Sequence, residues 1–241
     1  MVKPPSAHGP VTGAHGSGAD DRDVASRFCG RRRLPAPERR AQILAIAKDL
    51  FVREGIDRTT LRNIAAAAGI TATAIYDHFQ DKEALLAAIA DGYFDTLLAY
   101  KRRAVEGITA PLEQFRAMGR AYIACGLDHP EEYRLVFMTN LMAIKRGRRL
   151  SLRTPDHEVP KGAQSFLMLQ HQIERLMAEG LIAPGNAAAT AEVVWAGVHG
   201  LVTLMITHAN FDFAPRAELV ERLLELQEWG LRGAPPPPAT A

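Results

Sequence analysis

Two short helical patterns separated by one glycine, within residues 60–79, limit this chain to a small set of folds. Apolar residues recur at helical spacing over residues 61–68, and Gly69 then interrupts the pattern. A second short helix is predicted from Thr71, a suitable N-cap, to Phe79. Glycine at such a turn relieves the steric cost of a positive backbone angle. The segment therefore predicts a helix-turn-helix, whose second helix projects an exposed face.

Helical periodicity covers most of the remaining chain. One predicted helix precedes the pair and ends at Gly55, and a longer one follows Asp81 with a buried stripe that reaches Leu97. Later helices are predicted near residues 112–127, 130–146, 162–180, 187–209 and 216–231. No strand pattern of any length appears. We expect an all-α fold of about nine helices: a three-helix helix-turn-helix domain followed by a helical domain for ligand binding and dimerisation.

Composition shifts divide the chain into four segments. Residues 1–36 and 233–241 are polar or proline-rich, so they bury too little surface to offset chain entropy and are predicted to be disordered tails. The first tail ends in the basic run 30–33, which suits either an arm on a polyanion or a segment without a role. Residues 37–83 then form the helix-turn-helix domain and residues 84–232 the second domain.

Composition also narrows the location and chemistry. No apolar run is judged to reach the length needed to cross a bilayer, and the first thirty residues lack a signal-peptide core, so a cytoplasmic protein without membrane contact is expected. The two cysteines predict no disulfide, and no spacing suggests a metal site, cofactor or catalytic motif. Between Arg27 and Lys82 there are eleven basic and six acidic residues, an excess that suits nucleic acid.

The segment around the second short helix carries a family resemblance. The pattern Ile75-Tyr76-x-His78-Phe79-x-x-Lys82-Glu83-x-Leu85-Leu86 resembles the N-terminal domain of TetR/AcrR repressors, over about residues 38–86. The resemblance implies that Tyr76, His78 and Lys82 hold DNA phosphates. Lys82 lies in the first turn of a helix, where free backbone amides favour an anion. Phosphate contacts set the register of the protein on DNA rather than its sequence preference.

Base recognition is expected from the exposed face of the second short helix. The candidates are Thr71, Ala72, Thr73, Ala74 and Asp77, with Arg62 from the preceding helix. An arginine pairs with a guanine edge in bidentate fashion, whereas alanine touches at most a thymine methyl. Thr60 is a candidate phosphate contact, although capping alone would explain it. Two structural alternatives stay open, with Tyr76 a core aromatic and Arg62 a solvated helix residue.

Two motifs mark the second domain. His129-Pro130-Glu131-Glu132-Tyr133-Arg134-Leu135-Val136-Phe137 precedes Trp195-Ala196-Gly197-Val198-His199-Gly200, and together they resemble the C-terminal domain of the TetR branch named for its Trp-His-Gly signature. The resemblance covers about residues 115–210. It implies a regulatory domain but no particular ligand.

A stripe of aromatic and long apolar residues is a candidate effector pocket. Its members are Phe115, Met118, Tyr122, Phe137, Met138, Leu141, Phe166, Leu169, His171, Trp195 and His199. Such stripes also form ordinary core. His199 either donates to a ligand or satisfies a buried partner.

The helix near 187–209 is apolar nearly all round, so it requires cover from its own core and from a second subunit. Paired with the helix near 216–231, it predicts a four-helix homodimer interface. Two recognition elements related by two-fold symmetry suit an inverted-repeat operator in double-stranded DNA.

These features predict a ligand-responsive repressor, released from its operator by a small apolar or amphiphilic molecule. Two rivals from other classes remain: a small helical enzyme that uses His171 or His199 as an acid-base group, and an architectural DNA binder with a filled core. The absence of a nucleophile or carboxylate pair in the sequence argues against the enzyme.

Overall fold

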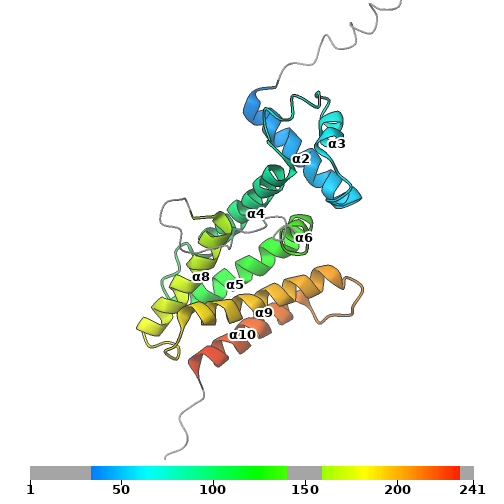
Figure 1. The fold of residues 1–241 in the computed structure, drawn as a ribbon. Coiled ribbons are helices and arrows are strands. Elements are labelled where there is room, and N and C mark those ends of the chain that lie inside the picture. Colours follow the sequence, from blue (N-terminus) through cyan, green and yellow to red (C-terminus); the bar gives the residue numbers. More distant parts are fainter. Residues whose placement is uncertain (1–33, 140–158, 234–241) are drawn as a thin grey trace, which may run out of the picture. The chain divides into compact units, whose positions relative to one another are not determined.

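A computed structural model describes residues 34–139 and 159–233, and within these ranges the chain forms eight α-helices and no strand (Figure 1). The helices are α2 (Ala36–Glu54), α3 (Leu61–Ala67), α4 (Lys82–Val105), α5 (Pro111–Asp128), α6 (Pro130–Phe137), α8 (Lys161–Ala178), α9 (Ala187–Thr207) and α10 (Arg216–Arg232). The expected all-α class is therefore confirmed. Most of the two predicted tails and the end of the helix predicted over 130–146 lie outside the described residues; the described part of that helix, α6, ends at Phe137.

The chain divides into two units, one reaching Arg39 and one running from Arg40 to the C-terminus. Of the first unit only residues 34–39 are described, where the Arg39 amide donates to the carbonyl of Pro35 in the first turn of α2. The second unit contains all the other described residues and is the one considered below.

Local capping sets the ends of α3. The Thr60 side chain accepts a hydrogen bond from the Asn63 amide, and the Asn63 side chain accepts one from the Thr60 amide, which is a capping box. At the other end Gly69 has φ +66°, and the Ile70 amide donates to the carbonyl of Ala65. This is the Schellman arrangement, in which a residue with positive φ closes the helix and glycine bears no steric cost.

The helix predicted over 71–79 is not a regular α-helix, and this prediction is wrong in detail. Residues 72–78 form consecutive turns. The amides of Tyr76 and His78 donate to carbonyls three residues back, and only the Phe79 amide reaches four residues back, to Ile75. A segment this short gains too few helical hydrogen bonds to offset nucleation, and its β-branched threonines add to that cost. Buried side chains hold it in place instead.

α4 connects the helix-turn-helix to the remaining helices through one buried cluster, which runs from Ile43 to Leu224. Its N-cap is Asp81, whose carboxylate accepts from the Ala84 amide at 2.6 Å. Leu85 and Leu86 lie in the cluster beside the helix-turn-helix core, and Leu97 lies about three turns further along the same helix. The border expected between residues 83 and 84 thus falls inside a continuous helix.

The helices after α4 pack around α5, which contacts α4, α8, α9 and α10 (Figure 1). α9 and α10 run side by side. The expectation that no apolar segment is long enough for a bilayer is wrong by length and composition, because α9 has 21 residues and a mean hydropathy of 1.5 over its most apolar stretch. It is the only such helix among the residues described. α9 packs on three other helices and carries polar groups toward α5 and α6, but only 28% of this apolar stretch is buried, so apolar side chains of α9 remain exposed.

Candidate DNA-binding surface and ligand cavity

The turn segment 71–79 presents one polar face and one buried face. Ile75 and Phe79 are buried in the helix-turn-helix core together with Ile64. The residues predicted to read bases lie mostly on the opposite side: Thr71, Ala72, Thr73 and Asp77 are exposed, and Ala74 is half-buried. Tyr76 is 58% exposed, which excludes the alternative of a core aromatic.

Two of the three threonines predicted to contact DNA have local hydrogen bonds. The Thr71 hydroxyl accepts from the Ala74 amide at 3.1 Å, and the Thr60 hydroxyl caps α3. The capping alternative for Thr60 is therefore present in the structure. Both side chains remain exposed, so a phosphate contact is still open to each and stays a prediction.

Lys82 has an internal role that the sequence did not predict. Its ammonium donates to the carbonyl of Ile56 at 2.9 Å and to that of Thr59 at 3.3 Å, so it fastens the start of α4 to the loop after α2. An ammonium has three donors, so one N–H is left for a phosphate. Lys82 is half-buried and is the first residue of α4. A phosphate that it contacts would therefore lie beside the N-terminus of α4.

The remaining basic candidates surround the turn segment. Arg62 is exposed on α3, and His78 is half-buried next to Tyr76. The Arg40 guanidinium lies 4.3 Å from the ring centroid of Phe79, a cation–π contact that places another positive charge beside the segment. Sequence patterns did not single out Arg40, because it belongs to a different predicted helix.

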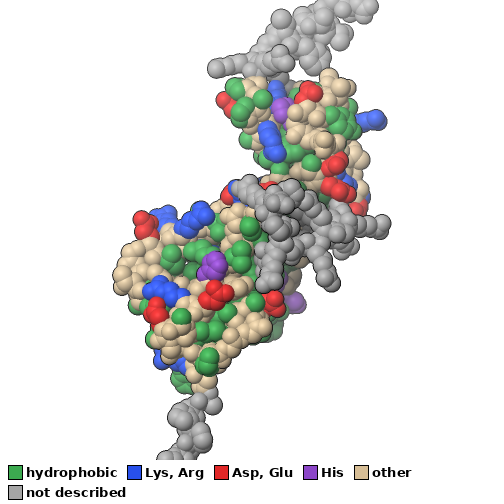
Figure 2. All heavy atoms as spheres, turned by 60° about the vertical axis from the view of Figure 1, so that its left-hand side comes forward, with side chains coloured by type: hydrophobic (Ala, Val, Ile, Leu, Met, Phe, Trp, Pro, Cys, Tyr) green, Lys and Arg blue, Asp and Glu red, His purple; other side chains and the backbone are tan. Residues whose placement is uncertain are grey.

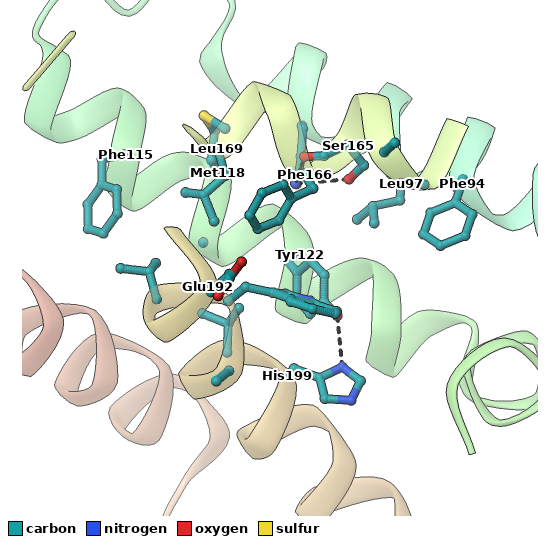
Figure 3. A pocket seen from close by; sticks show the side chains of 18 of the residues that line it. Phe94, Leu97, Phe115, Met118, Tyr122, Ser165, Phe166, Leu169, Glu192 and His199 are labelled. Atoms are coloured by element: carbon teal, nitrogen blue, oxygen red, sulfur yellow. Dashed lines mark hydrogen bonds between the residues drawn. The ribbon is translucent and has the colours of Figure 1, made fainter. Parts of the chain in front are cut away.

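A cavity of about 550 Å³ lies between α4, α5, α8 and α9 (Figure 3). This volume is within the usual range for small-molecule sites. Eight residues predicted for an effector pocket line it: Phe115, Met118, Tyr122, Phe137, Phe166, Leu169, Trp195 and His199. Its wall is predominantly apolar and aromatic, with few polar groups.

Two predicted pocket residues do not line this cavity. Met138 directly follows α6 and packs against the cluster that includes the helix-turn-helix core. His171 is exposed, because it lies two residues from both Leu169 and Ile173 and therefore on the opposite face of α8. A third, Leu141, lies outside the described residues.

A polar cluster joins three helices at one side of the cavity. The Tyr122 hydroxyl lies 3.0 Å from Nδ1 of His199 (Figure 3). The Tyr133 hydroxyl lies 2.5 Å from the same nitrogen, and Trp195 Nε1 donates to the Tyr122 hydroxyl at 3.0 Å. Burial lowers the pKa of His199 and so favours the neutral ring. His199 thus satisfies buried partners and also faces the cavity, which combines both alternatives considered for it.

The other polar group in the cavity wall is a buried cation. Lys101, on α4, is only 5% exposed, and its ammonium donates to the carbonyl and the hydroxyl of Ser165 at 2.9 and 3.0 Å. It also lies 5.7 Å from the ring centroid of Tyr122. Burial penalises the charged form and lowers the pKa of Lys101 to about 8, opposed by the smaller influence of Cys125.

Several lining residues were missed in the sequence, namely Phe94, Leu97, Lys101, Ser165 and Glu192. A signal existed for Lys101, because it follows Leu97 by four residues and so continues the buried stripe of its helix. Ser165 carried no signal, since its partner is 64 positions away. Across the described ranges, no group of three or more His, Cys, Asp or Glu side chains is arranged to hold a metal ion.

The fold and these surfaces define a helical protein with an N-terminal helix-turn-helix and a hollow C-terminal helical region. Comparison with family models agrees in both parts. Residues 43–89 match the model described as "Bacterial regulatory proteins, tetR family", and residues 115–226 match "Tetracyclin repressor-like, C-terminal domain". The chain belongs to the TetR family. The Trp-His-Gly branch is not named by either description and stays a prediction.

Individual relatives support the same family. The chain is 32% identical over 105 residues (44% of this chain, 48% of the relative) to the transcriptional activator FasR of Mycolicibacterium smegmatis. It is 35% identical over 80 residues (33% of this chain, 40% of the relative) to the transcriptional repressor KstR2 of Mycobacterium tuberculosis. It thus spans less than half the length of these two curated relatives. A solved structure of a Rhodococcus protein of unknown function has a TM-score of 0.65 and 28% identity, over 85% of this chain and 99% of that one.

Proposed function

We propose that this protein is a DNA-binding transcriptional regulator, acting as a homodimeric repressor that a small apolar or amphiphilic effector releases from an inverted-repeat operator. The observation that carries the proposal is the exposed face of residues 71–77, held above a buried Ile75 by a capped α3. A major groove admits an element of this size. Because operator DNA in bacteria is cytoplasmic, so is the proposed protein.

Contacts to DNA divide into two kinds in this proposal. Tyr76 and His78 hold phosphates from the exposed turn segment, and Lys82 does so with its remaining N–H. Arg62 and Thr73 contribute most of the base recognition, because alanines at 72 and 74 offer no hydrogen bond and Asp77 is repelled by phosphates. Domain limits of 37–83 and 84–232 belong to this proposal as well.

Dimerisation is supported by apolar side chains that α9 and α10 leave exposed. These are Val193, Trp195, Leu204, Leu226 and Trp229, the last of them 75% exposed. Hydrophobic side chains also reach the surface between charges of both signs in Figure 2. Exposed apolar side chains on two helices that lie side by side mark an interface, and in this proposal a second copy of α9 and α10 covers them in a two-fold arrangement.

Coupling between ligand and DNA is supported by the continuity of α4. Its first turn is fastened by Lys82 beside the DNA-binding segment, and its last turns contribute Leu97 and Lys101 to the cavity wall. A ligand that displaces the cavity end of α4 therefore acts on the spacing of the two recognition elements in the dimer. Coupling energies of this kind are commonly about 1–3 kcal/mol.

The experiment is a DNA-binding titration with the full chain and the DNA upstream of its own gene, at several salt concentrations. We expect a sequence-selective, salt-sensitive complex, and we expect Arg62→Ala to weaken it about tenfold or more. Arg175→Ala is the matched control, because Arg175 is exposed on α8, outside the proposed dimer interface, and its ion pair is with Glu179, the C-cap of that helix. No selective complex, or equal loss in both variants, contradicts the proposal.

The rival of an effector-independent DNA binder is disfavoured by the cavity, which a filled core would lack. For the enzyme rival, His171 stands exposed outside the cavity, and His199 is engaged by two tyrosines. The named relatives are an activator and a repressor. Repression is therefore tested separately, by transcription from the bound promoter with and without the protein.

A further inference from the structure

Lys101 is a positive charge enclosed by an apolar cavity wall. Around it lie Ser165 from α8 and Tyr122 and Cys125 from α5, none of which carries a negative charge in its usual state. Burial raises the pKa of Cys125 to about 11, which keeps its thiol neutral. Taking an ammonium out of water without a counter-charge is costly, so the fold holds this charge against a penalty.

No carboxylate of the described residues pairs with Lys101. The ion pairs found in those ranges all lie elsewhere, and Glu192, which also lines the cavity, is exposed and forms no ion pair with it. Two of the three ammonium donors go to Ser165, which leaves the third. The Ser165 hydroxyl accepts from Lys101 and keeps its own hydrogen for an acceptor. Figure 3 shows Ser165 near Phe166 and Leu97 in the wall.

We propose that the effector is an apolar molecule carrying a single carboxylate, which pairs with the Lys101 ammonium and accepts a hydrogen bond from the Ser165 hydroxyl. The inference rests on the proposed function, since it names the ligand class of the same cavity. One cation and one hydroxyl complement one negative charge, whereas a phosphate monoester brings nearly two and prefers arginine forks. The aromatic and aliphatic wall accommodates the remainder of the molecule.

The test compares ligands matched except for the head group. Binding of decanoic acid, decanol and decyl phosphate, and of naphthoic acid and naphthalenemethanol, is measured calorimetrically with the full chain and with Lys101→Met. Methionine keeps the length of the side chain and removes the charge, so this variant is expected to fold. A thermal unfolding curve and an unchanged complex with operator DNA verify that it does.

We expect the wild-type chain to prefer an acid over its alcohol by roughly tenfold to a hundredfold, the value of a charge-assisted hydrogen bond. The preference disappears in Lys101→Met while binding of the alcohol persists, and Ser165→Ala reduces it in part. Any of four outcomes overturns the inference. They are equal affinity of acid and alcohol, a preference for the acid that survives in Lys101→Met, tighter binding of the phosphate than of the acid, and no binding by either acid.

The DNA titration separates this inference from the proposed function. An acid that binds through Lys101 without changing operator affinity supports the ligand class and contradicts the effector role. Loss of operator binding in the unliganded wild type contradicts the proposed function alone. If an alcohol releases DNA as effectively as the matching acid, the effector role is supported. The proposed need for a carboxylate is then overturned.

Discussion

The DNA-binding segment and the cavity are assembled from the chain in opposite ways. Residues 60–82 are shaped by neighbours: Thr60 caps α3 through Asn63, Gly69 closes it, and Asp81 starts the next helix. The cavity instead collects side chains from Phe94 to Gln227. Structure formed by residues close in sequence can be predicted from local sequence patterns. A site assembled from distant residues depends on packing that no single segment specifies.

The two regions also differ in how fully they are packed. Ile64 and Ile75 are completely buried in the helix-turn-helix core, as expected where geometry has to be held for DNA recognition. Between α4, α5, α8 and α9, by contrast, about 550 Å³ is open. A fully packed helix-turn-helix core and a hollow C-terminal helical region on one chain are consistent with the proposed response to a ligand.

The largest effect is expected from truncating the tightly packed side. Ile64→Ala should lower the free energy of unfolding by about 2–5 kcal/mol, because it leaves a cavity in a full core. Leu97→Ala should cost less, because Leu97, although only 1% exposed, borders the cavity and so has open space on one side. Urea unfolding of both variants measures the difference. A greater loss for Leu97→Ala would remove the contrast in packing between the two regions.

The same contrast explains which features were predictable. The order and approximate bounds of the helices followed from periodicity, proline and glycine, and all described helices lie where they were expected. The segment 71–79 was predicted as a helix because its pattern is helical. Burial of Ile75 and Phe79 stabilises it as turns, so local hydrogen bonding did not have to complete a helix.

For the cavity, sequence patterns predicted the kinds of side chain but not all of their positions. Aromatic residues such as Phe166 and Trp195 were identified because large side chains at helical spacing tend to face inward. Lys101 was missed because a lysine is usually solvated, and only the pairing with Ser165 shows that this one is not. His171 was included although its register on α8 directs it outward.

A pH titration sharpens the contrast by acting on the cavity alone. Affinity for decanoic acid should fall as pH rises above about 8, by up to tenfold per pH unit, because Lys101 loses the proton that attracts the carboxylate. The acid remains ionised throughout this range. Calorimetry from pH 7 to pH 10 follows the loss, and the affinity of Lys101→Met should stay flat.

Other groups around Lys101 do not account for such a titration. Those facing it or adjoining it are Tyr122 and Cys125 on α5, Ser165 on α8, Glu192 and His199 on α9, and Arg102 and Arg103 on α4. Burial raises the pKa of Cys125 and of Tyr122 and lowers that of His199, so these groups stay neutral between pH 8 and pH 10. A pH-independent affinity in the wild type would contradict the role of Lys101.

Tyr76→Phe tests the proposed DNA-binding segment and leaves the cavity unchanged. Loss of one hydroxyl donor to a phosphate should weaken operator binding by about 0.5–1.5 kcal/mol, roughly threefold to tenfold. Fluorescence anisotropy with labelled operator measures this, and ligand affinity should not change. Tyr100→Phe is the control, because its hydroxyl donates to Asp128 at 3.2 Å, away from the turn segment. An equal effect of both substitutions would remove Tyr76 from the DNA contacts.

The smallest effect concerns the ion pair that joins the two regions. Lys48 on α2 donates to Glu132 on α6 at 2.6 Å, and the neighbouring Tyr133 reaches His199 in the cavity wall. Burial raises the pKa of Glu132, but hydrogen bonds from Lys48 and from the backbone outweigh it, so the net pKa is lowered. The pair is thus favourable in this state, although partial exposure limits it to about 0.5–1 kcal/mol.

Decanoic acid lowers operator affinity in the proposed mechanism, and Lys48→Met should make this decrease about twofold to fivefold smaller. Operator DNA alone and decanoic acid alone should each bind the variant nearly as they bind the wild type. Anisotropy titrations with and without the acid give this coupling directly. The matched control is Arg53→Met, whose ion pair with Asp49 is exposed and stays within α2. If the charge-swapped pair Lys48→Glu and Glu132→Lys restores the coupling, the contact itself transmits the change. Equal effects of Lys48→Met and Arg53→Met would mean that only the charge of α2 matters. α4 would then be the sole connection between the cavity and the turn segment 71–79.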